Sequence, residues 1–172
     1  MRCFIGAELP PDVKSKLWKL GRNIKGKHVE MENLHITIKF LGELKDDNSI
    51  SNIISRLSFI DNYNSIKIKL NGAGIFPSKI KPRVVWIGVI SKEFIDFMKN
   101  IDDALYPNFK RERNYVPHIT IARVKALSDD NIKELGNIGF IDEVEIKKVS
   151  IFKSTLLPTG PVYSRIKTWV LK

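Results

Sequence analysis

The sequence predicts an α+β protein with two pseudo-symmetric lobes of mostly antiparallel sheet, helices on the outside and a groove between the lobes. Short stretches of alternating apolar and polar residues, typical of strands with one buried face, take turns with helical patterns. The order strand, helix, strand, helix, strand occurs twice. The tetrapeptide HITI also occurs twice, at 35–38 and 118–121, an offset of 83 residues in a chain of 172. We therefore expect residues 1–172 to form a single domain of two intertwined lobes, each with one copy.

The first half begins with a short apolar strand over residues 2–8. Pro10 and Pro11 then open a helix that runs to Leu20, because proline suits the first helical turn. Residues 34–41 alternate between apolar and polar side chains as far as Phe40, which predicts a strand. A second helix is expected from residue 47 to 57, where an apolar stripe has helical spacing: Ile50, Ile53, Ile54 and Leu57.

The middle of the chain continues with a strand over 65–70, which again alternates. Glycine and proline in residues 71–83 predict a turn and a loop. The uninterrupted apolar run at 84–90 predicts a strand buried on both faces. A helix follows over 92–105, and a polar loop comes after it.

The last third contains the second HITI copy in a strand expected over 116–124. Ser128 is placed to cap a helix over 129–135, since serine accepts a hydrogen bond from the first helical turn. Two further strands are expected, over 143–154 and 162–171.

Charge makes polyanions plausible partners. The chain carries 29 Lys and Arg against 19 Asp and Glu, a formal charge of +10, and its basic residues are spread along the chain. Binding to such partners should weaken as salt rises. However, 21 of the basic residues are lysine, which is also a common solvated surface residue, so charge alone is weak support for nucleic acid binding.

The sequence has no long apolar segment and only one cysteine. No apolar run approaches the roughly 20 residues that cross a bilayer, and the N-terminus does not resemble a signal peptide. The single cysteine, Cys3, lies in the first apolar strand, and we expect it to be a buried core thiol. These features predict a cytoplasmic protein without a membrane partner.

The repeated tetrapeptide places an imidazole and a hydroxyl side by side. Residues two apart in a strand share a face, so His35 and Thr37 should point together, as should His118 and Thr120. Two such strands related by a pseudo-two-fold axis would direct all four side chains into one groove. The alternative is a pair of surface histidines on amphipathic strands, where Thr and Ile are favoured anyway.

Two histidines and two threonines suit in-line displacement at phosphorus. One imidazole can deprotonate the attacking water while the other protonates the leaving oxygen, because the ordinary histidine pKa of about 6.5 permits both forms near neutral pH. Threonine hydroxyls can donate to the non-bridging phosphate oxygens. The chemistry requires no metal or other cofactor, and His28, His35 and His118 lack the spacing of known zinc sites.

The two copies differ five residues after the histidine, where the first has Phe40 and the second has Arg123. A guanidinium at this position would suit phosphate binding. Strand parity places Arg123 on the side away from His118, so it reaches the groove only if the strand ends or bulges near Ala122. Residues 21–28 (GRNIKGKH) look like a nucleotide-binding loop but follow a helix and end in His, so we expect no ATP site there.

Both motifs, together with FIGAELP, GAGIFPSKIKPRVVWIGV and FKSTLLPTGPVY, resemble the 2H phosphoesterase superfamily. The chain is most similar to the RNA 2',3'-cyclic phosphodiesterases formerly called 2'-5' RNA ligases. The resemblance extends over nearly the whole chain. It implies an enzyme that opens a terminal 2',3'-cyclic phosphate of RNA to a 2'-phosphate without ATP.

The resemblance also implies individual roles. His35 would be the proton donor, His118 the proton acceptor, and Arg123 a substrate-binding residue. Phe76 would stack on the terminal base near the groove, although a phenylalanine beside a turn is as easily explained as core. Ser154 and Tyr163 are weaker candidates, since the segment around them is also typical of a simple turn.

Several activities are compatible with these motifs. The reverse reaction, 2'-5' ligation of RNA, uses the same groups, and so does the cleavage of other cyclic or 2'-5' phosphodiesters. A third possibility is an RNA-binding module without turnover. The expected partner is RNA ending in a 2',3'-cyclic phosphate, including tRNA halves, bound by a monomer.

Overall fold

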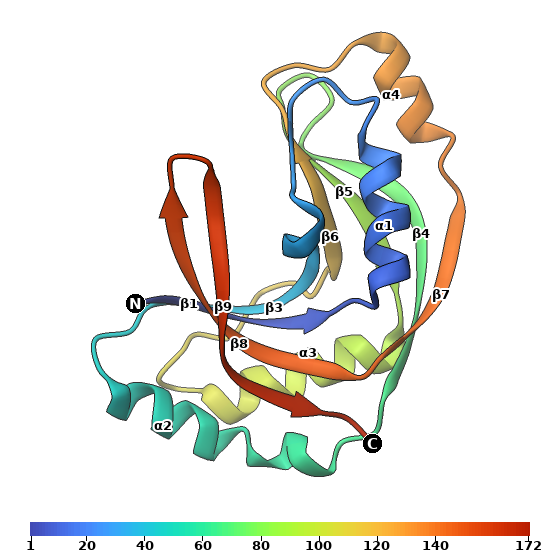
Figure 1. Ribbon diagram of the computed structural model, residues 1–172. Helices are drawn as coiled ribbons and strands as arrows, with labels where there is room; N and C mark the ends of the chain where they lie inside the picture. The colour runs from blue at the N-terminus through green and yellow to red at the C-terminus, as the bar shows by residue number, and fades with distance from the viewer.

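The computed structural model describes residues 1–172 and contains two antiparallel sheets with four α-helices (Figure 1). The first sheet consists, in spatial order, of β3 (His35–Glu43), β1 (Arg2–Glu8), β8 (Lys148–Leu157) and β9 (Gly160–Val170). The second consists of β2 (Lys27–His28), β6 (His118–Arg123), β5 (Pro82–Ile90), β4 (Ile66–Pro77) and β7 (Phe140–Ile146). The predicted α+β class is confirmed.

The helices cover the outer faces of the sheets: α1 (Pro11–Gly21), α2 (Asp47–Arg56), α3 (Lys92–Leu105) and α4 (Asp129–Gly136). Two short 3-10 helices, η1 (Met31–Asn33) and η2 (Ser58–Asn62), lie between them. Three α-helices begin at a side-chain cap, supplied by Asp46, Ser91 and Ser128, and the predicted cap at Ser128 is confirmed.

Two helices connect the two sheets. Helix α1 follows β1 of the first sheet but packs on β6 of the second, whereas α3 follows β5 of the second sheet and contacts both β4 of that sheet and β3 of the first. Figure 1 shows α1 beside the second sheet and α2 and α3 below the first. As a result, the apolar core is a single cluster of 38 buried residues. Cys3 belongs to it, and burial raises the pKa of this thiol.

The predicted loop over residues 71–83 is wrong for its first half, because β4 continues to Pro77. The strand bends at a β-bulge between Leu70 and Ala73, where Gly72 has a φ of +78°. Gly74 lies directly under an indole ring: a β-carbon there would be 2.0 Å from Cζ2 of Trp86. The glycines therefore permit a bulge and a close approach within a strand, and do not end it.

The predicted single strand over 143–154 is in fact two strands in different sheets. β7 ends at Ile146, and β8 begins at Lys148. Lys147 and Lys148 are both exposed and interrupt the alternation of buried and exposed residues, which marks the crossing between sheets.

The strand β5 was predicted to be buried on both faces, and this is also wrong. Val85, Ile87 and Val89 are buried, but Val84 and Trp86 on the other face are only partly covered. That face is the one that carries Trp86 toward the second motif.

No helix of the structure is long and apolar enough to span a membrane.

Candidate active site

The two HITI strands lie in contact, β3 at the edge of the first sheet and β6 in the second. In both strands the isoleucines are buried and the histidine and threonine are partly exposed, as the period of two requires. Burial is the main cause of the lowered pKa of His35, and positive charge on His118 acts in the same direction. The fold thus brings the two motifs, 83 residues apart in the sequence, to one place.

The two imidazoles are held in the same way. Nδ1 of His35 lies 2.7 Å from the carbonyl oxygen of Asn33, and Nδ1 of His118 lies 2.8 Å from that of Val116. A carbonyl oxygen only accepts hydrogen bonds, so each Nδ1 must carry a proton. In both rings Nε2 is therefore the atom that can exchange a proton with a bound group.

His35 is packed among aromatic rings on the face of the first sheet. Its ring centroid is 4.8 Å from that of Phe4 and 5.5 Å from that of Tyr163. Burial lowers the pKa of His35 below 6.5; the Asn33 hydrogen bond opposes this shift, and the charge of Lys14 adds to it. The free protein therefore favours a neutral His35.

Gly6 is part of the same packing. A β-carbon on Gly6 would lie 3.3 Å from Cδ2 of His35 and 3.3 Å from the Phe152 ring, which is tighter than ordinary contact. Its role was not predicted from the sequence, because a strand glycine shows its purpose only when the facing ring is known.

His118 has a more open environment. Its ring contacts Phe76 and Trp86, with centroids at 5.6 and 5.9 Å, and its Nε2 has no hydrogen-bond partner within the protein. Phe76 is 40% exposed and so is not a core residue. The structure places this predicted stacking residue next to the second histidine, with its ring accessible.

The two motif threonines also differ. Oγ1 of Thr37 lies 2.9 Å from Nε2 of His35, so this hydroxyl is engaged with the histidine of its own motif. Thr120 makes no side-chain hydrogen bond and its hydroxyl is available to a ligand.

A β-bulge follows the threonine in β3. In the pairing with β1, Gly6 is opposite Thr37 and Ile5 is opposite Lys39, so Ile38 is an extra residue. Ile38 and Lys39 are consecutive buried residues, and the strand changes face after them.

The second motif has the same bulge at the same place. Its register with β5 shifts between Thr120 and Ala122, which makes Ile121 the extra residue. Ile121 and Ala122 are both buried, and Arg123 emerges exposed on the side of His118. The condition set by strand parity is met, and the guanidinium is brought to the histidine face.

The positive charge of Arg123 acts electrostatically on Tyr163, a residue of the other sheet. Burial raises the pKa of the Tyr163 hydroxyl, and the charge of Arg123 acts against that shift. Arg123 comes from the second sheet and Tyr163 from β9 of the first. Ser154 lies opposite Tyr163 in the β8–β9 hairpin and has no hydrogen bond to the motif residues.

Comparison with known proteins identifies the family. The sequence profile of the family described as LigT like Phosphoesterase matches residues 8–86 and again residues 88–163, one stretch for each HITI copy. The chain belongs to this family. Its relatives include an RNA 2',3'-cyclic phosphodiesterase of Methanocaldococcus jannaschii, 40% identical, with 98% of this chain and 100% of that protein covered.

Two further similarities agree with this. A protein of the same name from Methanothermobacter thermautotrophicus is 33% identical, and the match covers 99% of each chain. The crystal structure of TT0787 of Thermus thermophilus superposes with a TM-score of 0.84 at 24% identity, and covers 99% of this chain and 98% of that one. It supports the fold of this LigT-like phosphoesterase.

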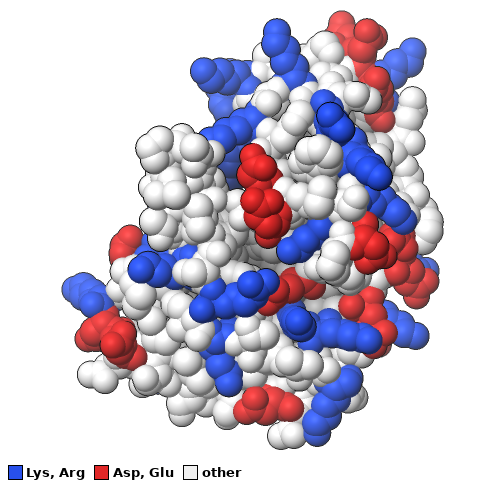
Figure 2. All heavy atoms as spheres, in the orientation of Figure 1, with Lys and Arg blue, Asp and Glu red and all other residues white.

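A cavity of about 400 Å³ borders His35 in this LigT-like phosphoesterase. It lies between the β8–β9 hairpin and the segment around η1, where Figure 2 shows a hollow. Charged residues in its wall include Glu8, Lys14 and Arg165. Burial opposes ionisation of Glu8, but hydrogen bonds from Arg165 and Ser150 lower its pKa overall. No role was predicted for these residues: Glu8 stands in the FIGAELP segment without a chemical signal of its own, and Lys14 and Arg165 belong to no motif.

Charged side chains elsewhere do not single out a site. Figure 2 shows basic residues spread over the visible face with acidic residues among them. No group of three or more His, Cys, Asp or Glu side chains is arranged to hold a metal ion. The segment 21–28 joins α1 to the short strand β2, and its His28 bonds to the carbonyl oxygen of Ile24 at 2.6 Å.

Proposed function

We propose that this protein hydrolyses the terminal 2',3'-cyclic phosphate of RNA to a 2'-phosphomonoester, without ATP or a metal ion. The observation that carries the proposal is the pair of histidines on two strands in contact, each with Nδ1 bonded to a carbonyl oxygen, so that Nε2 is the atom for proton transfer. Relatives named RNA 2',3'-cyclic phosphodiesterase, at up to 40% identity, supply the substrate class.

The proposed step is a single in-line displacement. Water attacks phosphorus on the His118 side, and Nε2 of His118 takes one of its protons. A new P–O bond forms while the bond from phosphorus to the ribose 3'-oxygen breaks, and His35 gives its Nε2 proton to that oxygen. The 2'-phosphate remains, and the two histidines regain their starting protonation by exchange with solvent.

The negative charge of the phosphate accounts for the protonation of His35. Burial alone favours the neutral ring, which would suit a base better than an acid. An anionic phosphate beside the ring favours the imidazolium, so substrate binding raises the His35 pKa and prepares the donor. His118 is more open to solvent and to the attacking water, in keeping with the acceptor role.

The other motif residues hold the phosphate. Thr120 and Arg123 can donate to its non-bridging oxygens, and the Arg123 charge offsets the charge that develops on them. The Thr37 hydroxyl donates a hydrogen bond to the neutral His35 ring. When the ring is protonated, the same hydroxyl can donate to a phosphate oxygen instead. Phe76 is accessible for stacking on a base of the RNA.

A direct test uses an RNA that ends in a 2',3'-cyclic phosphate, incubated with the protein in EDTA, with the product identified by mass spectrometry and by its resistance to a 3'-specific phosphatase. The expected product is the 2'-phosphate. A 3'-phosphate, or turnover only after metal is added, would contradict the proposed reaction. Binding without turnover would indicate an RNA-binding module.

The same experiment separates the related activities. Supplying RNA halves with a 2',3'-cyclic phosphate and a 5'-hydroxyl tests 2'-5' ligation, and 2'-5' linked dinucleotides test other cleavage. We propose that RNA, including tRNA halves, is bound by a monomer in the cytoplasm. The charge of +10 supports a polyanionic partner, whose affinity should fall as salt rises.

A further inference from the structure

A buried ion pair lies just beyond the first motif and takes no part in the proposed chemistry. Lys39 follows HITI in β3, and its side chain is 4% exposed; Asp102 of α3 is 1% exposed. Burying two charges is expensive, and an apolar pair of similar volume is often as stable or more stable. Stability alone therefore does not explain why this pair is charged.

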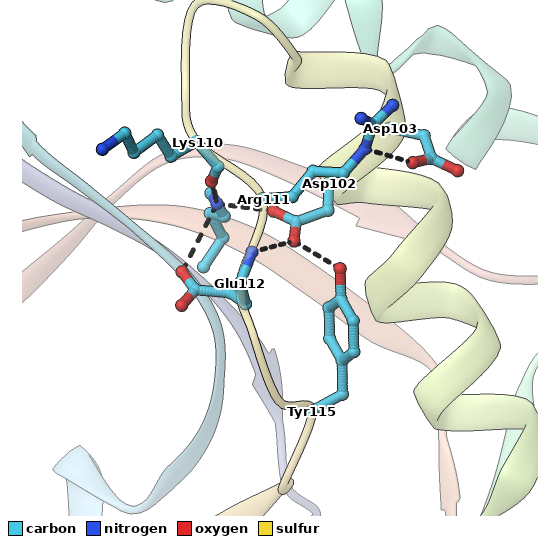
Figure 3. A network of polar contacts seen from close by, with 7 residues as sticks. Asp102, Asp103, Lys110, Arg111, Glu112 and Tyr115 are labelled. Atoms are coloured by element: carbon cyan, nitrogen blue, oxygen red, sulfur yellow. Dashed lines mark hydrogen bonds and ion pairs between the residues drawn. The ribbon is translucent and has the colours of Figure 1, made fainter.

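The hydrogen bonds of the pair lead into one loop (Figure 3). Oδ2 of Asp102 accepts from the main-chain N–H of Glu112 at 2.7 Å and from the Tyr115 hydroxyl at 2.6 Å. The Lys39 ammonium donates to the carbonyl oxygen of Lys110 and lies 3.4 Å from the Glu112 carboxylate. All these partners belong to the segment between α3 and β6.

That segment makes few other polar contacts. No hydrogen bond between two main-chain groups involves residues 110–117, and the other ion pair that joins the segment to α3 is the exposed one of Arg111 with Asp103. Burial and the hydrogen bond to Asp102 raise the pKa of Tyr115 to about 12, so its hydroxyl remains a donor over the working pH range. Asp102 is thus the main polar anchor of the loop.

The loop leads directly into β6, which begins at His118. Val116 follows Tyr115 directly, and its carbonyl oxygen is the acceptor 2.8 Å from Nδ1 of His118. This hydrogen bond keeps the proton on Nδ1 and leaves Nε2 unprotonated at the groove. The contacts therefore run from the strand of the first motif to the imidazole of the second.

We propose that Lys39, Asp102 and Tyr115 are positioning residues for His118, because they fix the Val116 carbonyl that sets its tautomer and orientation. The second motif has no equivalent of the Lys39–Asp102 ion pair, because Ala122 occupies in β6 the bulge position that Lys39 occupies in β3. This inference rests on the proposed acceptor role of His118. It also implies that the first motif strand controls the geometry of the second.

The test is Tyr115→Phe, which removes one hydroxyl from the anchor, with Asp102→Asn as a stronger variant. We expect kcat for RNA 2',3'-cyclic phosphate to fall about tenfold in Tyr115→Phe with KM within about twofold, because misplacing a reacting group slows chemistry more than binding. Asp103→Asn is the matched control: it breaks the exposed 2.8 Å pair with Arg111, on the same helix and loop, and should leave both constants unchanged.

A spectroscopic readout separates positioning from loss of structure. In ¹H–¹⁵N spectra of the imidazoles, we expect His118 to be the Nδ1–H tautomer in the wild type and in Asp103→Asn, and a tautomer mixture in Tyr115→Phe, with His35 unchanged. Unchanged kcat together with an unchanged His118 tautomer in Tyr115→Phe would overturn the inference.

Equal perturbation of both histidines would also overturn it, because that result indicates a general structural role. The tautomer measurement does not need turnover. If the wild type fails to hydrolyse the cyclic phosphate, the proposed function fails while the positioning of His118 is still tested.

Discussion

The two copies of HITI have the same four residues and nearly the same backbone, including the bulge, yet their histidines differ. His35 is enclosed by Phe4 and Tyr163 and its Nε2 is hydrogen bonded to Thr37. His118 is more open and its Nε2 is unpaired. Neighbours outside the motif, and not the motif, therefore give the two imidazoles their separate properties.

The residues after the motif extend this contrast. The first copy continues with a buried lysine and Phe40, and the second with a buried alanine and Arg123. One bulge therefore serves an internal ion pair and the other presents a guanidinium to the groove. Substitutions in each of the two copies can test this contrast.

The largest effect is expected from removing either imidazole. His35→Ala and His118→Ala should each reduce kcat on the order of 1,000-fold, since general acid and general base each contribute strongly. Initial rates with the cyclic phosphate substrate measure this, and circular dichroism and RNA affinity should stay close to wild type. Normal activity in either variant would remove that histidine from the proposed mechanism.

The residues at the two bulges should not be equivalent. Arg123→Phe should lower kcat/KM on the order of 10- to 100-fold, because a charge-assisted contact to phosphate is lost. Phe40→Arg, the matched change in the other copy, should alter kcat/KM by less than about twofold, since Phe40 is already exposed. Equal losses in the two variants would show that the bulges have the same role.

The glycines under the two aromatic clusters should differ in stability. Gly74→Ala should lower the free energy of unfolding by roughly 1–3 kcal/mol, because a β-carbon would overlap the Trp86 ring at 2.0 Å. Gly6→Ala meets its rings at 3.3 Å and should cost less. Gly136→Ala, with open space around it, is the control, and urea unfolding gives all three values.

The smallest effect concerns the protonation of His35. Its pKa should lie below 6.5 in the free protein, because burial disfavours the imidazolium, and should rise when inorganic phosphate is added. NMR titration of the ring protons measures both. A His35 pKa that phosphate leaves unchanged would contradict the proposed route to the proton donor.

The same shift has a consequence for stability. An unfolded histidine binds a proton more readily than buried His35, so the stability contributed by the neutral ring is present above about pH 6.5 and is lost as the pH falls toward the folded pKa. The free energy of unfolding of His35→Gln should therefore fall less between pH 7 and pH 5 than that of the wild type.

Most elements could be predicted from local pattern. The helix over 92–105 was predicted at its observed bounds, and the strand bearing the first motif was predicted to within two residues at its far end. The errors occur where local chemistry serves a distant partner. The glycines after residue 70 accommodate a bulge and the Trp86 ring, and the lysines at 147 and 148 mark a change of sheet.

Local pattern was enough to establish the α+β class, the two histidine and threonine pairs, and the face of each strand on which they lie, because a period of two is a property of neighbouring residues. It was not enough to show that the pairs meet, that Arg123 turns toward His118, or that burial lowers the pKa of His35. These depend on the register between strands and on rings contributed by β1, β4, β5 and β9. Such contacts join residues far apart in the chain, so they exist only once the two sheets have packed together.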